Sequence, residues 1–216
     1  MATNARAGER DVRREVLEVA TRLMAARGFD GTSLQDIADE VGVSKPAVLH
    51  HYPSKEHIHQ AVMQAILNHW RDTLPRVMLA ATTGEDRFDA IYRELQRFFR
   101  ENPDRARLLV RQGLDRPEVL REMLKTTVRP WLSAIAGYIR MGDSTGRQPS
   151  DLDAEAYAIL ALQLVIFSSA MGDTVSVAID DSDEARARYY REVVRIARSS
   201  LFVDARSPEA RPARGE

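Results

Sequence analysis

Residues 29–58 read FDGTSLQDIADEVGVSKPAVLHHYPSKEHI and predict two short helices joined by a tight turn. Apolar residues recur at three- and four-residue spacing over residues 34–41, which is typical of an amphipathic helix, and Gly42 ends that helix. Ser44 is a preferred N-cap residue for the second helix, and Pro46 falls in its first turn, where proline is tolerated. The pattern therefore predicts a helix, a four-residue turn and a second short helix.

A helix pair of this kind meets the requirements of the helix-turn-helix, in which the second helix lies in the major groove of DNA. The helices need a small residue where they approach each other, and Ala38 stands there. The turn needs a residue that tolerates positive φ, which Gly42 supplies, and Val48 packs the second helix back onto the first. A purely structural helix pair is the alternative. The helix-turn-helix interpretation gives ten candidate DNA-binding residues: Thr32, Ser33, Ser44, Lys45, Pro46, Ala47, His50, His51, Tyr52 and Lys55.

Basic residues flank this helix pair on both sides. Lys55 lies in the first turn of the next helix, where a positive charge opposes the helix dipole unless a negative group compensates, and we expect DNA phosphate to do so. Towards the N-terminus, Arg6, Arg10, Arg13 and Arg14 alternate with acidic residues. They either form an arm that reaches phosphates or the minor groove, or they cover a solvated helix face.

From Val12 to Leu67 the sequence resembles the DNA-binding domain of the tetracycline-repressor (TetR) family. The resemblance is carried by the run VLEVATRLMAARGFDGTS at residues 16–33, by the helix-turn-helix, and by Tyr-Pro-Ser-Lys-Glu at residues 52–56. It implies nine helices, a divergent ligand-binding domain and a dimer interface formed by the last two helices. This chain has Leu49 where the family often has a phosphate-contacting tyrosine, and Pro46 where it often has glycine.

The rest of the chain also has helical periodicity, and no alternating strand pattern occurs, so the fold class is all-α. Gly, Pro and Asn residues divide the 216 residues into further helices, expected over 12–28, 55–74 (ending at Pro75), 85–101, 103–113, 117–141, 152–175 and 183–203. We expect a three-helix DNA-binding domain with an N-terminal arm over residues 1–55. A helical ligand-binding and dimerisation domain follows over 56–205, and residues 206–216 form a disordered tail.

Several classes of enzyme and metal site are excluded by residue types. The chain has no cysteine, so it forms no disulfide, thiolate zinc site or cysteine nucleophile. It also has no glycine-rich phosphate loop, nucleophile elbow or His-Glu metal motif, so we expect neither a catalytic residue nor a cofactor. Five histidines fall between residues 50 and 69, but His57 and His59 face different sides of a helix, so we expect no metal site.

The longest uncharged stretch, residues 156–172, has 17 residues, fewer than the roughly 20 that span a bilayer. We therefore expect a buried helix there and no membrane partner. The N-terminal ten residues lack the apolar core of a signal peptide, so a cytoplasmic location is expected.

Aromatic residues are concentrated in the second domain, where the simplest interpretation is core packing. A ligand cavity between the helices of a bundle is lined by the same residue types. The residues that we expect to line such a cavity are Tyr92, Phe99, Trp131 and Phe167, with Gln112 and Gln163 as polar contacts.

The two final helices are apolar over more than one face. A core within the chain covers one side, and a second subunit covering the rest gives a two-fold, four-helix interface. The expected interface residues are Ile159, Leu162, Ile166, Tyr190, Val194, Ala197 and Leu201.

Together these features predict a homodimeric transcriptional regulator, specifically a repressor that a small apolar effector releases from a palindromic double-stranded operator. A ligand-independent regulator, an activator with the same fold and a small helical enzyme are the alternatives. Saturable small-molecule binding, the sign of a reporter response and substrate turnover distinguish them.

Overall fold

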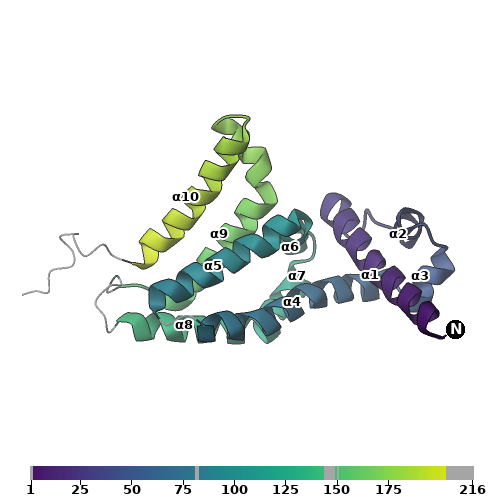
Figure 1. Ribbon diagram of the computed structural model, residues 1–216, viewed down its shortest axis with the longest axis horizontal. Helices are drawn as coiled ribbons and strands as arrows, with labels where there is room; N and C mark the ends of the chain where they lie inside the picture. Colours follow the sequence, from purple (N-terminus) through teal and green to yellow (C-terminus); the bar gives the residue numbers. More distant parts are fainter. Residues whose placement is uncertain (1, 81–82, 144–148, 150, 203–216) are drawn as a thin grey trace, which may run out of the picture.

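The computed structural model describes the backbone of residues 2–80, 83–143, 149 and 151–202, and the side chains from Val12 onward within those ranges, up to Met141 in the second. All regular structure in these ranges is helical, as the sequence predicts. Figure 1 shows a small head of helices at one end, a longer bundle beside it, and a hairpin of two helices that rises from the bundle.

The head is built from α1 (Ala2–Arg27), α2 (Leu34–Val41) and α3 (Lys45–His51), and its turns form as predicted. The Ser33 side chain caps α2 and exchanges hydrogen bonds with Asp36 in a capping box. Gly42 ends α2 with φ of 77°, a left-handed conformation that glycine adopts without strain. The Ser44 side chain caps α3 by accepting a hydrogen bond from the backbone N–H of Ala47.

The next helix, α4 (Lys55–Ala80), continues through Pro75, so the prediction that it ends there is wrong. Pro75 is exposed, whereas Thr73 and Met78 on either side of it are buried. Burial of these flanks outweighs the roughly 3 kcal/mol that a proline costs inside a helix. The Arg76 guanidinium also folds back and donates to the carbonyl of Asp72 at 3.0 Å.

Helix α4 contributes residues to both hydrophobic cores of the molecule, the one in the head and the one in the bundle. Ile58, Val62 and Met63 pack into the head core with α1, α2 and α3. Ile66, less than one turn further on, packs into the core of the bundle. The first turns of α4 therefore belong with the head, and the packing boundary lies beyond residue 55.

The bundle, which we call the body, contains the remaining helices. They are α5 (Gly84–Glu101), α6 (Pro103–Asp115), α7 (Pro117–Met123), the π-helix η1 (Leu124–Val128), α8 (Arg129–Asp143), α9 (Ala154–Val175), the 3-10 turn η2 (Ser176–Ala178) and α10 (Asp183–Leu201). The described ranges thus hold ten α-helices where the resemblance implies nine, because the single segment expected over 117–141 is divided by the π-helical turn. The predicted tail, 206–216, lies outside the described residues.

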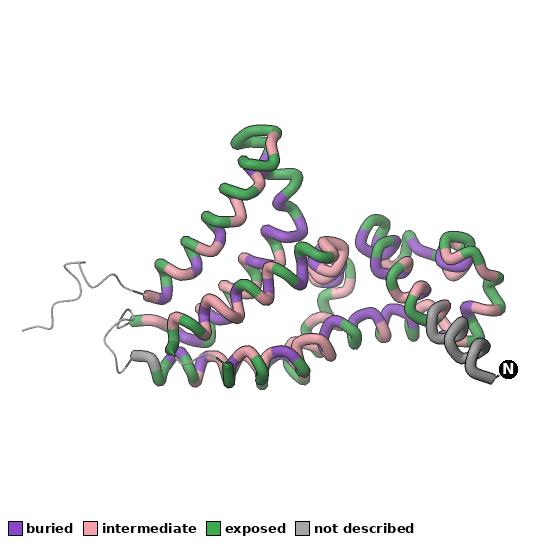
Figure 2. The backbone as a smooth tube through the Cα atoms, in the orientation of Figure 1, coloured by how far each residue is buried: buried purple, intermediate pink, exposed green. Residues whose placement is uncertain are grey.

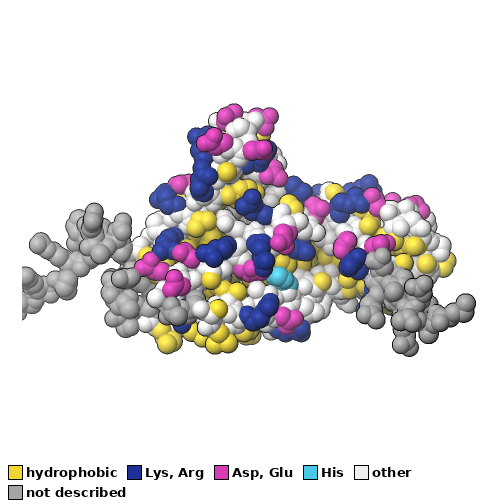
Figure 3. All heavy atoms as spheres, viewed as in Figure 1, with side chains coloured by type: hydrophobic (Ala, Val, Ile, Leu, Met, Phe, Trp, Pro, Cys, Tyr) yellow, Lys and Arg dark blue, Asp and Glu magenta, His cyan; other side chains and the backbone are white. Residues whose placement is uncertain are grey.

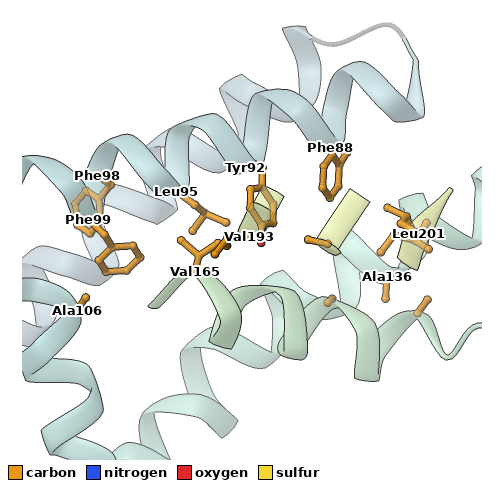
Figure 4. Close-up of a cluster of buried hydrophobic side chains, with 14 of the residues drawn as sticks. Phe88, Tyr92, Leu95, Phe98, Phe99, Ala106, Ala136, Val165, Val193 and Leu201 are labelled. Atoms are coloured by element: carbon orange, nitrogen blue, oxygen red, sulfur yellow. The ribbon is translucent and has the colours of Figure 1, made fainter. Parts of the chain in front are cut away.

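Five buried residues of α5 form the central layer of the body core, in which Phe98 stacks on His69 of α4, whereas Tyr92 and Leu95 lie towards α10 and α9 (Figure 4). They are Phe88, Tyr92, Leu95, Phe98 and Phe99. Val165 of α9 and Val193 of α10 pack against this layer. The opposite flank of the α9–α10 hairpin is exposed (Figure 2), so packing within the chain covers only part of these helices.

Candidate DNA-binding head and ligand cavity

The short helix α3 presents one face to solvent and one to the head core. Val48 is fully buried and holds α3 against the head. Lys45, Pro46 and His50, all predicted to contact DNA, are exposed, and Ala47 and His51 are half-buried. This outward face is the part of the head that a DNA groove can contact.

Two other predicted DNA-binding residues face inward. Thr32 is 1% exposed, and its hydroxyl donates to the carbonyl of Gly28 at 2.9 Å. Tyr52 is 4% exposed, and its hydroxyl donates to the carbonyl of Arg13 at 3.3 Å and accepts from that arginine's Nε at 3.4 Å. Tyr52 therefore ties the end of α3 to α1, and Thr32 closes the turn between α1 and α2.

Ser33 and Ser44 remain exposed, but both serve as helix caps. The hydrogen bond from the Ser33 hydroxyl lowers the pKa of Asp36, so this carboxylate stays ionised at the positive end of α2.

The Lys55 ammonium has an electronegative partner within the head, so its charge does not require a DNA phosphate to compensate it. The Lys55 ammonium donates to the carbonyl of Phe29 at 2.9 Å and lies 4.2 Å from the centre of its ring. The backbone oxygen and the ring face supply the negative partner that the dipole argument requires. Of the expected N-terminal arm, Arg6 and Arg10 lie outside the described side chains, Arg13 packs on Tyr52, and Arg14 lies 3.5 Å from Glu18.

Helix α6 clamps the body onto the head. The guanidinium of Arg111 donates from Nε to the carbonyl of Ala25 and from Nη2 to that of Ala26, both at 2.9 Å. These carbonyls lie in the last turn of α1, where the helix itself supplies no partner. Gly28 follows with φ of 78°, and it brings Arg111 and Asp115 close to the end of α1.

A buried hydrogen bond joins α4 to α6 beside this clamp. His59 Nε2 lies 2.6 Å from Gln112 Oε1, and Gln112 Nε2 donates to the carbonyl of Arg116 at 3.1 Å. Because that oxygen can only accept, His59 carries its proton on Nε2. Burial lowers the pKa of His59, which keeps the ring neutral. Gln112, predicted to contact a ligand, therefore belongs to the junction between head and body.

An apolar cavity of about 1300 Å³ lies in the body, between α4, α5, α8 and α9, with α6, α7 and η1 closing one end. Tyr92, Phe99, Trp131, Gln163 and Phe167, all predicted to line it, do so. Gln163 and Phe167 are exposed and therefore lie at its rim. Leu109, Val110 and Gly113 of α6 also line the cavity, so α6 is at once a cavity wall and the clamp on the head.

The polar groups of this cavity are few. Among the described residues that line it, the charged ones are Glu85 and Arg87, both in the first turn of α5. The Tyr92 hydroxyl is buried without a hydrogen-bond partner, and burial raises the pKa of Tyr92 to about 12. The neighbouring Tyr157 hydroxyl donates to the carbonyl of Ala197 at 2.7 Å. A charged ligand group would be poorly solvated here except near the start of α5.

The outward face of α9 carries a row of exposed residues at three- and four-residue spacing: Ala156, Leu160, Gln163, Phe167 and Met171. The expected interface residues lie elsewhere. Ile159, Leu162 and Ile166 are half-buried and line the cavity, and Tyr190 and Val194 are half-buried beside the core. Ala197 (3% exposed) and Leu201 (4% exposed) pack inside the chain.

Charge is unevenly distributed over the body. Acidic side chains gather at the tip of the α9–α10 hairpin (Figure 3), where Asp180, Asp181, Asp183 and Glu184 are exposed. This end of the body would repel phosphate. Among the side chains that the structure describes, no three His, Asp or Glu residues are grouped so as to hold a metal ion.

Residues 16–62 match the model of the bacterial regulatory proteins of the tetR family. Over 113 residues the chain is 28% identical to IcaR, the negative transcriptional regulator of the biofilm operon icaADBC in Staphylococcus epidermidis. That alignment covers 51% of this chain and 58% of IcaR. Over 146 residues it is 29% identical to the transcriptional regulator RutR of Escherichia coli, covering 65% and 68% of the two chains. The chain belongs to the TetR family.

A solved structure extends the similarity beyond the head. The ketosteroid transcriptional regulator KstR2 of Mycobacterium tuberculosis superposes with a TM-score of 0.72 over 89% of this chain and 95% of its own, at 15% identity. The body therefore has the TetR fold although its sequence has diverged. This TetR-family chain is a DNA-binding transcriptional regulator.

The family match and the head core coincide closely. Residues 16–62 begin at Val16 and end at Val62, both buried members of that core. The contacts that fasten this TetR head to its body, above all Arg111, were not identified from sequence. Arg111 and its acceptor Ala25 lie 86 residues apart along the chain, so no local sequence pattern indicates this contact.

Proposed function

We propose that this regulator is a homodimeric repressor that binds a palindromic operator through α3 and is released by a small apolar ligand in the body cavity. The observation that carries this proposal is the double role of α6. Its residues Leu109, Val110 and Gly113 line the cavity, whereas Arg111 and Gln112 hold the head. A ligand that moves this helix also moves the head.

The exposed face of α3 supports the DNA contact. Lys45, Pro46 and His50 project from α3, which Val48 packs against the head core and the Ser44 side chain caps. In helix-turn-helix dimers, two such helices bind half-sites about 34–36 Å apart or a multiple of that distance. A palindromic operator follows from a two-fold symmetric protein.

The α9 helix supports the dimer. The stretch Ala154–Ala178, which is α9 with the turn η2 after it, is strongly apolar, yet only 33% of its most apolar part is buried within the chain. By length and composition this helix meets the criteria for a membrane span, but the core helices of soluble proteins do so too. For a DNA-binding regulator, a second copy of the chain is the natural cover for the row from Leu160 to Met171, and a cytoplasmic location follows.

The cavity chemistry supports an apolar ligand. Its walls are mainly Leu, Ile, Val, Met and aromatic side chains, and its charged groups are restricted to one end. A hydrophobic molecule gains roughly 25 cal/mol for each Å² of apolar surface that it buries there. KstR2, whose fold this chain shares, is described as a ketosteroid regulator, and a compound of similar apolar character suits this cavity.

The mechanism is a shift between two conformations. The ligand binds better to the conformation in which the two heads are mis-spaced, so operator affinity falls by the ligand's differential affinity for the two states. A coupling free energy of about 1–3 kcal/mol gives a 5- to 150-fold change in operator affinity.

Fluorescence anisotropy with DNA from directly upstream of the protein's own gene tests the DNA-binding part, with a shuffled duplex as the control. We expect binding to the native duplex to be tighter by about a thousandfold or more, with a steep salt dependence. Equal, weak binding to both duplexes would contradict operator recognition at that site.

An apolar compound that quenches tryptophan fluorescence saturably and lowers duplex affinity would support the repressor mechanism. A compound that raises affinity would favour an activator.

A further inference from the structure

The DNA-facing surface of α3 contains an apolar pair. Leu49 is 37% exposed, and Pro46, three residues earlier, is also exposed. Residues three apart on a helix are neighbours, so the two side chains form one small apolar surface. Lys45 and His50 flank it, and Val48 on the opposite side is buried in the head core. We call Pro46 and Leu49 the apolar pair.

The apolar pair restricts what α3 can contact in a groove. An aliphatic side chain has no donor for phosphate oxygens. Against the polar edge of a base it removes water without replacing the lost hydrogen bonds, which is unfavourable. In the major groove, one base edge offers an apolar group: the 5-methyl group of thymine.

We propose that Leu49 determines operator specificity by packing against the methyl group of a thymine in each half-site, with Pro46 bordering the same contact. This inference rests on the proposed function, because it requires α3 to enter the major groove. Lys45 and His50 then supply the polar contacts on either side. The head thus selects a T·A pair at this position through apolar contact, and it discriminates against base pairs that present only polar atoms there.

The size of the effect follows from the area that one methyl group buries. Burial of one such group is worth about 0.8 kcal/mol, which is about fourfold in affinity. Two symmetric half-sites give about fifteenfold when both methyl groups are removed. Deoxyuridine removes this methyl group and keeps every hydrogen-bonding atom of thymine, so the substitution isolates the contact.

The experiment begins by selecting duplexes from a random-sequence pool with the full-length protein. Each thymine of the selected consensus is then replaced in turn by deoxyuridine, and affinities are measured by anisotropy for the wild type and for Leu49→Ala. We expect one thymine per half-site at which deoxyuridine weakens wild-type binding by about fourfold. Leu49→Ala should bind the thymine and deoxyuridine duplexes equally. Because Leu49 is partly exposed and alanine favours helix, this variant should fold, which its circular dichroism spectrum checks.

Lys45→Ala is the matched control, because Lys45 lies on the same face but carries a charge. It should weaken binding to all duplexes and keep the sensitivity to deoxyuridine. If no thymine shows the effect, or if Leu49→Ala retains the full deoxyuridine effect, the inference about Leu49 is overturned while operator binding stands. If the wild type selects no consensus at all, operator recognition itself fails, and the inference fails with it.

Discussion

The buried polar groups of the head and of the body differ in their hydrogen bonding. In the head, Tyr52 and Lys55 each donate to a backbone carbonyl of another segment, and Thr32 donates to the carbonyl of Gly28 within the turn between α1 and α2. In the body, the Tyr92 hydroxyl is buried beside a cavity of about 1300 Å³ and has no partner among the described residues. Fully paired polar groups hold one arrangement, whereas an unpaired group beside empty space leaves the body able to change. The head is therefore the more rigid of the two regions, and the proposed ligand would act on the body.

The largest expected difference between head and body is the loss of unfolding free energy when a core side chain is truncated, because the two regions differ in packing density. Ile37, fully buried in the head core, should lose about 2–5 kcal/mol of unfolding free energy on Ile37→Ala, because the change leaves a cavity. Ile135→Ala should lose much less, because the half-buried Ile135 side chain already borders the cavity. Urea denaturation at one fixed protein concentration measures both, since association also stabilises the fold. Equal losses would show that the body is as tightly packed as the head.

The clamp between the two regions should give the next largest effect. Arg111→Met leaves the carbonyls of Ala25 and Ala26 without their charged donor, and we expect a loss of about 2–3 kcal/mol in unfolding free energy. Arg195→Met, the control, removes an exposed ion pair with Glu192 and should change stability by less than about 0.5 kcal/mol.

Arg111→Met also tests whether α6 couples the body cavity to the DNA affinity of the head. If α6 transmits the state of the cavity to the head, Arg111→Met should still bind an apolar compound, but this compound should no longer lower its affinity for operator duplex. If the compound still lowers the operator affinity of Arg111→Met, a contact other than the Arg111 clamp couples the cavity to the head.

Two tyrosines of the body should respond with opposite signs. Tyr92→Phe removes a hydroxyl that has no partner, so stability should stay unchanged or rise by up to about 1 kcal/mol. Tyr157→Phe removes the hydrogen bond to the carbonyl of Ala197 and should lose about 1 kcal/mol. Thermal denaturation of the two variants side by side measures the difference. A clear loss in Tyr92→Phe would mean that its hydroxyl is paired in solution.

The smallest effect concerns pH at the junction. Burial lowers the pKa of His59 below its ordinary value near 6.5, so the folded protein resists a protonation that the unfolded chain accepts. Stability should therefore be full above about pH 6.5, fall as the pH drops below it, and level off once His59 is protonated in the folded state. His59→Gln should flatten part of this slope in urea titrations at several pH values. His69, whose pKa burial also lowers, contributes the remainder.

The predictability of each region from sequence follows from the range of its interactions. The cap at Ser44 and the turn at Gly42 depend on residues three or four positions away, so the sequence predicts them correctly. The partner of Lys55 lies 26 residues away, and that of His59 lies 53 residues away. Such contacts depend on tertiary packing, which also carries α4 through Pro75. Aromatic residues of the body could be expected at the cavity because apolar ligand sites between helices are commonly lined by such residues.

In the proposed dimer, two rigid heads are carried at a spacing that the bodies set. Because the chain has no cysteine, Gln60→Cys on the exposed side of α4 places one spin label on each head. Pulsed electron–electron double resonance then measures the distance between the two labels with and without the selected operator duplex. The account predicts one narrow distance on the duplex and a broader or displaced distribution without it. The absence of any dipolar signal, or a distribution that the duplex leaves unchanged, would contradict it.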